Sequence, residues 1–383
     1  MRTCDIAIVG LGLMGSAALH QLVRRGADVL GFDPLAIGEA RGSSHGSCRI
    51  FRRFNFESAA YTGLSDRAFA GWRALEAESG QTILMPSAIL EAGPAGCEPV
   101  MKSRAAALAA NSTITGPRNG REANAVYPAF SLPEDWDVVV HDSGGILLAE
   151  RAMRALRLSV GHRVIQEAAR IAPTPAGIRI STTSKELMAR QVIVSAGPWV
   201  GDLMPNLKRH LKVTRQAVGW FAPARPETTA YGQLPLFLLR APRGNIYGFP
   251  DFEGRGVKAA QHDHGPVVGP DEWDPPASDA ELATTSAMLA ELIPGAAGAI
   301  IDRDVCLYTN TARADVIADD GGEFIIDRLP ADPRIIVASP CSGHGAKFAT
   351  AIGAMLADMA LDPTLKAIGA FRLDRFSSFA SSS

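Results

Sequence analysis

A glycine-rich turn near the amino terminus constrains this 383-residue chain more than any other feature. The run 5–9, which is apolar after Asp5, is typical of a buried strand, and it leads into the sequence GLGLMG at residues 10–15. In such a G-x-G-x-x-G pattern, glycines permit a sharp turn, a close approach of backbone N–H groups to a pyrophosphate, and tight packing of the following helix. The pyrophosphate would lie at the positive end of that helix. The residues predicted to bind a dinucleotide here are Gly10, Gly12, Leu13, Met14 and Gly15.

An acidic residue follows where a ribose-binding carboxylate is expected. Asp33 follows a second apolar run, 29–32, and lies 18 residues beyond Gly15. A carboxylate at this point favours an adenosine ribose without a 2′-phosphate. The first 33 residues alone are compatible with a nicotinamide enzyme as well as with a flavin enzyme.

The remaining strand patterns predict an α/β fold with two interleaved domains. The apolar strand 191–197 and the strand, glycine loop and helix of 334–361 resemble the first segment, and both suit a Rossmann-type domain. Between 214 and 258, short alternating strands indicate an antiparallel sheet of an α+β substrate domain. Asp-Ser-Gly-Gly at 142–145 predicts a turn. The predicted nucleotide-binding segments are 1–78, 142–212 and 304–383, and the predicted substrate-binding segments are 79–141 and 213–303.

Composition narrows the possible partners and the compartment. The net charge is −2 and no long charged block occurs, so we expect no nucleic-acid or membrane partner. No apolar run reaches the length of a membrane span. The five cysteines are scattered without C-x-x-C pairs, which predicts a reducing, cytoplasmic setting and neither a zinc site nor a disulfide framework.

A polar loop after the second predicted strand combines hydrogen-bond donors with positive charge. Ser43 and Ser44 offer hydroxyl and backbone donors, and His45 and Arg49 add charge that suits an electron-rich cofactor or an anion. Arg52 could present its guanidinium fork to a carboxylate. The alternative interpretation is an ordinary solvated basic loop.

The antiparallel segment carries a lysine in a strand. If Lys258 points inward, it marks a functional site, because lysines are seldom buried without a partner; the alternative is a solvated lysine on the outer face. Nearby, His262 and His264 could suggest a metal. Two histidines alone are a weak metal signal, so we expect no metal site.

Two further candidates lie in the last third of the chain. Cys306 lies in the apolar strand 305–309, where a cysteine is usually a small buried hydrophobic residue. The loop 342–345 opens a helix whose N–H groups can stabilise negative charge. Lys347 lies in the first turn, where the helix dipole disfavours a cation, and this conflict indicates a purpose such as carboxylate binding. The candidate cofactor contacts in this segment are Gly343, His344, Gly345 and Lys347.

In combination, these motifs resemble the monomeric sarcosine oxidase and N-methyltryptophan oxidase family of D-amino-acid-oxidase-like flavoenzymes. The resemblance spans nearly the whole chain. Its carriers are residues 10–15 with Asp33, 42–52, 247–250, Lys258, 305–309, 324–327, 342–348 and 371–373.

The resemblance implies FAD, so that the Rossmann-type domain becomes an FAD-binding domain. It implies attachment of the flavin to Cys306 through an 8α-S-cysteinyl bond, with His45 and Arg49 beside the flavin ring. It further implies that Lys258 lies over the flavin N5 region and, as a fixed cation, promotes the reaction with O2.

The resemblance also assigns a substrate pocket. Arg52 and Lys347 would hold the substrate carboxylate, and Tyr247, Tyr308 and His262 would line the pocket. The sequence departs from the family where Ser47-Cys48 replaces Asp-Thr and where Leu238 replaces the methionine of sarcosine oxidases. These changes touch the pocket, so the resemblance leaves the substrate open.

The function implied is an FAD-dependent oxidase of N-methyl or other secondary amino acids. Hydride would pass from the carbon beside the amine to flavin N5, O2 would be reduced to H2O2, and the imine would hydrolyse. We expect a monomer whose partners are a small amino acid and O2. The alternatives are a fructosyl-amino-acid oxidase, a flavin dehydrogenase with another electron acceptor, and a non-catalytic FAD-binding subunit of a larger oxidase.

Overall fold

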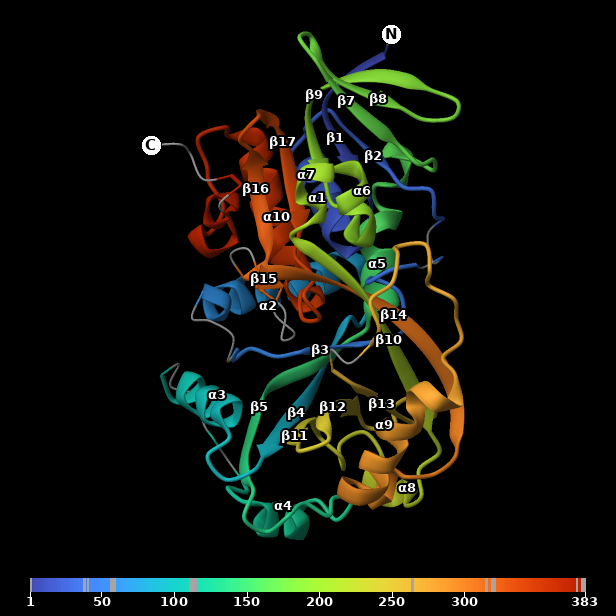
Figure 1. Ribbon diagram of the computed structural model, residues 1–383, viewed down its shortest axis with the longest axis vertical. Coiled ribbons are helices and arrows are strands. Elements are labelled where there is room, and N and C mark those ends of the chain that lie inside the picture. Colours follow the sequence, from blue (N-terminus) through green and yellow to red (C-terminus); the bar gives the residue numbers. More distant parts are fainter. Residues whose placement is uncertain are drawn as a thin grey trace.

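Two sheets organise the protein. The computed structural model describes residues 2–379 except 37–38, 40, 56–59, 110–113, 115, 263–264, 314–315, 318–321 and 377. One sheet lies in the upper half of Figure 1 and the other forms the lower half, with the long strands β10 and β14 reaching up toward the junction. The predicted α/β class with a Rossmann-type part and a second sheet is confirmed.

The upper sheet has the strand order β16-β17-β9-β1-β2-β6. Strand β1 pairs in parallel with β2 and β9, and β9 pairs in parallel with β17. Strand β2 is buried along its whole length, as expected for a parallel sheet covered on both faces. The strands are β1 (Arg2–Val9), β2 (Val29–Phe32), β6 (Val164–Ile165), β9 (Glu186–Val194), β16 (Ile325–Leu329) and β17 (Asp332–Ser339), and the hairpin β7 (Arg170–Thr174) and β8 (Gly177–Ser181) joins β9.

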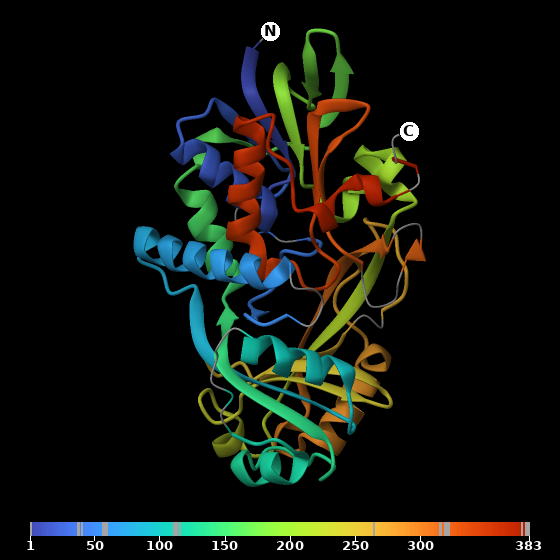
Figure 2. The same cartoon turned by 90° about the vertical axis from the view of Figure 1, so that its left-hand side faces the viewer.

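Helices cover one face of this sheet. Helix α1 (Leu13–Arg24) and helix α10 (Ala349–Leu361) stand side by side in Figure 2, with α2 (Ala60–Ser79) crossing below them. The two upright helices can approach closely because Gly353 has no side chain. A Cβ at this position would lie 2.5 Å from the Cβ of Ala17. Ile6 and Ile8 pack toward this helical core, and the alternate residues of β1 face a second core on the other side.

The lower sheet has the order β15-β14-β10-β13-β12-β11-β4-β5-β3. All neighbours in it are antiparallel except β4 and β11, which pair in parallel. The strands are β3 (Arg49–Phe51), β4 (Leu84–Gly93), β5 (Asp137–Leu147), β10 (Leu211–Phe221), β11 (Leu236–Ala241), β12 (Gly244–Phe249), β13 (Val257–Gln261), β14 (Ile300–Arg313) and β15 (Val316–Ile317).

One face of the lower sheet packs on an apolar core that includes helix α9 (Asp279–Leu292), and the opposite face is left for the cavity described below. The other helices are α3 (Glu98–Ala109), α4 (Gly120–Val126), α5 (Ala149–Leu158), α6 (Val200–Leu203), α7 (Pro205–Lys208) and α8 (Pro226–Thr229). The 3-10 turns are η1 (Gly161–Arg163), η2 (Gly197–Trp199), η3 (Pro294–Ala296), η4 (Ala346–Phe348), η5 (Gly369–Phe371) and η6 (Leu373–Arg375).

The turn predicted at 142–145 is wrong, because strand β5 continues through it to Leu147. Gly144 and Gly145 serve close packing here. A Cβ on Gly144 would lie 2.3 Å from Cγ1 of Ile89, and one on Gly145 would lie 2.7 Å from the carbonyl oxygen of Met85. Glycine pairs occur both in turns and in strands where a neighbouring strand packs closely. The local sequence therefore could not distinguish a turn from a strand at this point.

Sheet membership cuts across the predicted domain boundaries. Strand β3 belongs to the lower sheet although residues 1–78 were assigned to nucleotide binding, and strands β5 and β14 run across the boundaries at 142 and 304. The division into domains therefore stays a prediction. In the described part of the chain, no helix has both the length and the apolar character needed to span a membrane.

Candidate functional site

A cavity of about 1110 Å³ runs from the glycine turn to the lower sheet. Its walls contain every predicted site residue except Gly15. These are Gly10, Gly12, Leu13, Met14, Asp33, Ser43, Ser44, His45, Arg49, Arg52, Tyr247, Lys258, His262, Cys306, Tyr308, Gly343, His344, Gly345 and Lys347. Residues spread from 10 to 347 thus meet in one space, and their individual roles stay predictions.

The glycine end of the cavity is built from tightly packed backbone. Gly10 has φ +89°, and a Cβ there would lie 2.5 Å from the Cα of Ala196. The hydroxyl of Ser195 donates to the Gly10 carbonyl at 2.7 Å. A Cβ on Gly15 would lie 1.9 Å from the same carbonyl oxygen. Gly15 therefore brings α1 against the turn, and leaves the start of the helix open toward the cavity.

Asp33 lies beside this turn at the end of β2. Its carboxylate accepts hydrogen bonds from the backbone N–H groups of Leu11, at 2.6 Å, and of Leu35, at 2.9 Å. These two bonds fix the carboxylate in the wall of the cavity, where a ribose hydroxyl could reach it.

The lower sheet supplies the other end of the cavity through strand alternation. In β14 the side chains of Asp304, Cys306 and Tyr308 share one face because they are two residues apart. Across the sheet, Lys258 of β13 is paired with Phe249 of β12 and with Trp220 of β10. Residues that are far apart in the sequence therefore line the same floor.

Lys258 points inward and is 4% exposed. Its ammonium donates to the Cys48 carbonyl at 3.2 Å and lies 5.1 Å from the ring centroid of Trp220 and 5.2 Å from that of Phe249. Burial is the main cause that lowers the pKa of Lys258, and the nearby Arg49 guanidinium lowers it further. The outward, solvated alternative is thereby excluded for this lysine.

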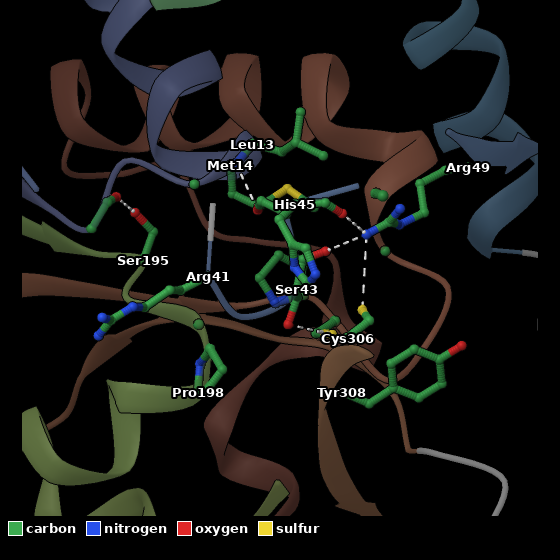
Figure 3. Close-up of a pocket in the computed structure, with 18 of the residues that line it drawn as sticks. Leu13, Met14, Arg41, Ser43, His45, Arg49, Ser195, Pro198, Cys306 and Tyr308 are labelled. Carbon is green, nitrogen blue, oxygen red and sulfur yellow. Dashed lines mark hydrogen bonds between the residues drawn. The ribbon is translucent and has the colours of Figure 1, made fainter. Parts of the chain in front are cut away.

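Arg49 links the polar loop to the cysteine strand, as Figure 3 shows. Its guanidinium donates to the carbonyls of Cys48 at 2.8 Å, Ser43 at 3.0 Å and His45 at 2.5 Å, and its Nη2 lies 3.8 Å from the Cys306 sulfur. Burial alone would lower the pKa of Arg49, but the Cys306 thiol and the nearby tyrosines raise it. Burial raises the pKa of Cys306 while Arg49 opposes that shift. A sulfur reacting here would have a fixed cation beside it.

Two tyrosines and a histidine stand over the same floor. The hydroxyls of Tyr247 and Tyr308 hydrogen-bond to each other, and the ring of His262 lies 5.7 Å from that of Tyr308. Burial raises the pKa of Tyr247 to about 12 and that of Tyr308 well above its ordinary value. Both phenols are therefore neutral hydrogen-bonding groups at physiological pH.

Two more buried cations come from opposite parts of the chain. Arg52 and Lys347 are each 4% exposed, and turn η4, which carries Lys347, packs against strand β3 just before Arg52. The Lys347 ammonium donates to the His344 carbonyl at 2.8 Å and lies 4.3 Å from the ring centroid of Phe348. Cations held in a shared cavity at this depth suit a small carboxylate.

Sequence reasoning missed two carboxylates that touch these groups. Glu91 of β4 is 2% exposed, lies 3.8 Å from Arg52 Nη1, and accepts a hydrogen bond from the Ser103 hydroxyl at 2.9 Å. Asp304 lies 3.3 Å from His45 Nε2. The position of Asp304, two residues before Cys306 on the same strand face, was a usable signal. The sequence carries no such signal for Glu91, because its contact with Arg52 depends on how the strands pair.

Comparison with known proteins identifies the family. The model of the family described as FAD dependent oxidoreductase matches residues 5–359. This chain belongs to that family. A protein named monomeric sarcosine oxidase from Bacillus sp. (strain B-0618) is 31% identical over 370 residues, covering 93% of this chain and 92% of the relative. A protein named N-methyl-L-tryptophan oxidase from Yersinia pestis (strain Pestoides F) is 29% identical, covering 97% and 99%.

Solved structures agree on the fold of this FAD-dependent oxidoreductase. NikD, described as an unusual amino acid oxidase essential for nikkomycin biosynthesis, has a TM-score of 0.82 at 17% identity and covers 97% of this chain and 99% of its own. Fructosyl amine:oxygen oxidoreductase (Amadoriase I) from Aspergillus fumigatus has a TM-score of 0.77 at 17% identity, with coverage of 97% and 89%. The predicted family, the FAD cofactor and the fold are confirmed.

The residues of the cavity fit FAD. A Cβ on Gly12 would lie 2.8 Å from the Ser44 hydroxyl, so only a glycine leaves room between the helix start and the polar loop. The same cavity, about 1110 Å³ in volume, continues from there to Cys306, so that the glycine turn and the cysteine strand can contact one ligand. No three potential metal ligands gather among the described residues, which do not include Asp263 and His264.

Proposed function

We propose that this enzyme is an FAD-dependent oxidase of N-methyl or other secondary amino acids. The observation that carries the proposal is a set of cations in one cavity with Cys306: the buried Arg52, Lys258 and Lys347, and the partly buried Arg49. The relatives named sarcosine oxidase and N-methyltryptophan oxidase support this substrate class. Bound FAD would accept a hydride from the carbon next to the amine nitrogen and pass the electrons to O2, which yields H2O2.

The chain's own side chains would orient the substrate. Arg52 and Lys347 would bind its carboxylate, and this clamp would decide which carbon faces the cofactor. The neutral phenols of Tyr247 and Tyr308, together with His262, would form the wall around the amine. The amine must be uncharged to react, and a cationic environment favours loss of its proton. Water would then hydrolyse the imine product.

The remaining cations would act on the cofactor side. Lys258 and Arg49 would hold positive charge beside the flavin ring, and Lys258 would promote the reaction with O2. Cys306 would carry a covalent bond to the flavin, which is supported by its place beside Arg49. A cytoplasmic monomer remains our prediction for the state of the enzyme.

Peroxide release by the purified enzyme tests the function. We expect substrate-dependent H2O2 with N-methyl amino acids in air, and none with fructosyl amino acids. Peroxide only with fructosyl amino acids would assign the enzyme to the Amadoriase class, whose fold it shares. Dye reduction without peroxide would make it a dehydrogenase. No turnover without a co-purifying protein would indicate a non-catalytic subunit.

Acid precipitation tests the covalent bond separately. We expect a yellow pellet from the native enzyme and a colourless one from Cys306→Ala. Cys97→Ala is the matched control, because Cys97 is a free thiol that does not line the cavity. A colourless native pellet would show that the cofactor is bound without a covalent link.

A further inference from the structure

A buried carboxylate lies on the cavity face of the lower sheet. Glu91 of β4 pairs with Leu238 of β11, and residues paired across neighbouring strands point to the same face. Leu238 lines the cavity, and Ile89, two residues before Glu91, belongs to the same apolar cluster as Leu238. The intervening residues Leu90 and Ala92 belong to the core on the opposite face. Glu91 therefore points toward the cavity side of the sheet and is buried there.

Side chains of α3 and β5 hold this carboxylate. Its Oε2 accepts a hydrogen bond from the Ser103 hydroxyl at 2.9 Å, and its Oε1 lies 3.5 Å from Nε2 of His141. The ring of Phe54 packs edge-on against that of His141, with centroids 5.5 Å apart. Burial raises the pKa of Glu91, but the contacts with His141, Arg52 and Ser103 outweigh burial and lower it. The carboxylate is thus ionised at neutral pH.

Arg52 is held at both ends. The Ser65 hydroxyl of α2 donates to the Arg52 carbonyl at 3.4 Å, and the Asn55 amide donates to the same hydroxyl at 2.8 Å. At the far end of the side chain, Nη1 of Arg52 lies 3.8 Å from Oε2 of Glu91. Arg52 lines the cavity, so its side chain starts from a fixed backbone and ends beside a buried anion.

An anion beside Arg52 has two opposite effects on a bound carboxylate. It restricts the long arginine side chain before the ligand arrives, which saves the cost of ordering that side chain on binding. It also repels a second carboxylate. A guanidinium has five N–H donors, and the contact at 3.8 Å is longer than a hydrogen bond, so Glu91 need not occupy the donors that a ligand requires. The affinity of a variant without the charge of Glu91 decides which effect is larger.

We propose that Glu91 is a positioning residue that orients the Arg52 guanidinium toward the carboxylate of the substrate. Glu91 is not among the described residues that line the cavity, so it acts through Arg52 and not on the substrate itself. The inference rests on the proposed function, in which Arg52 forms half of the carboxylate clamp.

Binding of a carboxylate that cannot be oxidised tests the proposal. The probe is (methylthio)acetate, in which sulfur replaces the amine of N-methylglycine, and its dissociation constant is read from the absorbance of the flavin-loaded enzyme. We expect Glu91→Gln to weaken binding about 10-fold, the cost of ordering one long side chain. Glu98→Gln is the matched control, because it removes the same charge from an exposed pair with Lys102 on α3. It should leave the affinity unchanged.

A double-mutant cycle with Arg52→Met separates positioning from a general structural effect. If Glu91 acts through Arg52, Glu91→Gln should have no further effect on the affinity of Arg52→Met. A general disturbance of the cavity would weaken binding equally in both backgrounds. If Glu91→Gln does not fold, Ser103→Ala takes its place, because it removes a hydrogen bond that holds Glu91 and keeps the charge. We expect Ser103→Ala to weaken binding about 3-fold, and only when Arg52 is present.

The outcomes distinguish this inference from the proposed function. Unchanged or tighter binding in Glu91→Gln, or an equal loss in the Arg52→Met background, would overturn the role of Glu91 alone. A native enzyme that does not bind the probe would overturn both the carboxylate clamp and the role of Glu91. Normal binding of the probe without peroxide from N-methyl amino acids would overturn the proposed function, while the affinities would still decide the role of Glu91.

Discussion

The backbone shapes one end of the cavity, whereas long side chains shape the other. At the glycine end, backbone groups and missing Cβ atoms shape the wall, and Asp33 is held by two backbone N–H groups. At the sheet end, long side chains from separate strands and turns meet, and Arg52, Lys258 and Lys347 are buried as cations. We expect the first end to anchor the dinucleotide and the second end to select the reaction that the dinucleotide supports.

This difference predicts different responses to substitution. A change at the glycine end should affect folding and retention of FAD together, because no atom there can move aside. A change at the sheet end should leave FAD bound and alter one step of turnover, because each cation has its own contacts.

The largest effect is expected for Gly10→Ala. The substitution places a Cβ 2.5 Å from a backbone atom in a left-handed conformation, so we expect the free energy of unfolding to fall by about 4 kcal/mol, with loss of FAD. Chemical denaturation and flavin absorbance measure both. Gly26→Ala is the control, since Gly26 also has positive φ but no atom within 4 Å, and it should cost about 1 kcal/mol. Equal losses would show that packing at the turn is unimportant.

Next in size is Lys258→Met, which should slow the reaction of the reduced cofactor with O2 about 100-fold by removing a buried cation. Anaerobic reduction by the substrate should change little, and stopped-flow absorbance separates the two steps. Burial lowers the pKa of Lys258, so its ammonium should lose its proton at a pH below about 10.4, the pKa of a free lysine. The rate of the reaction of the native enzyme with O2 should therefore fall as the pH rises through this lowered pKa. The variant should lack this fall. A slowed substrate step with normal O2 reactivity would show that Lys258 acts on substrate oxidation and not on the reaction with O2.

Lys347→Met should weaken binding of a carboxylate substrate about 30-fold, or about 2 kcal/mol, because it removes half of the proposed clamp. Titration of the flavin spectrum with a small carboxylate inhibitor gives the dissociation constant. Lys208→Met, at an exposed lysine paired with Asp202, should not change it. Equal affinities in the native enzyme and in Lys347→Met would remove this lysine from the clamp.

An effect no larger than that of Lys347→Met is expected for Glu91→Gln. Burial would raise the pKa of Glu91, but the hydrogen bond with His141 and the charge of Arg52 lower it overall. A lowered folded pKa contributes stability that is complete above the unfolded value, about 4.3, and is lost as pH falls through the folded pKa.

We therefore expect Glu91→Gln to cost about 2 kcal/mol at neutral pH, as judged by urea unfolding, and the difference from the native enzyme to shrink in acid. Glu98→Gln, which breaks only an exposed pair with Lys102, should give no measurable difference. A constant difference across the acid range would mean that Glu91 acts through its shape and not its charge.

Much of the nucleotide end was predictable because its signals are local. The strand, the GLGLMG turn and the helix lie within one stretch of about 20 residues, and each glycine has a steric reason that the sequence alone implies. The resemblance to flavoenzymes extended this to FAD and to the residues that line the cavity. Lys258 could be named as a candidate, but whether it points inward depended on its strand register.

Tertiary structure decided what local patterns could not. Gly144 and Gly145 look like a turn and lie within a strand, because Ile89 occupies the space that a Cβ would need. Glu91 and Asp304 carry no motif, and their contacts with Arg52 and His45 exist only because separate strands are paired. By itself, the sequence determined a dinucleotide-binding turn, since that information is local and steric, and the resemblance to a flavoenzyme family added the flavin. The charges at the far end are set by long-range pairing, and only the folded chain brings them together.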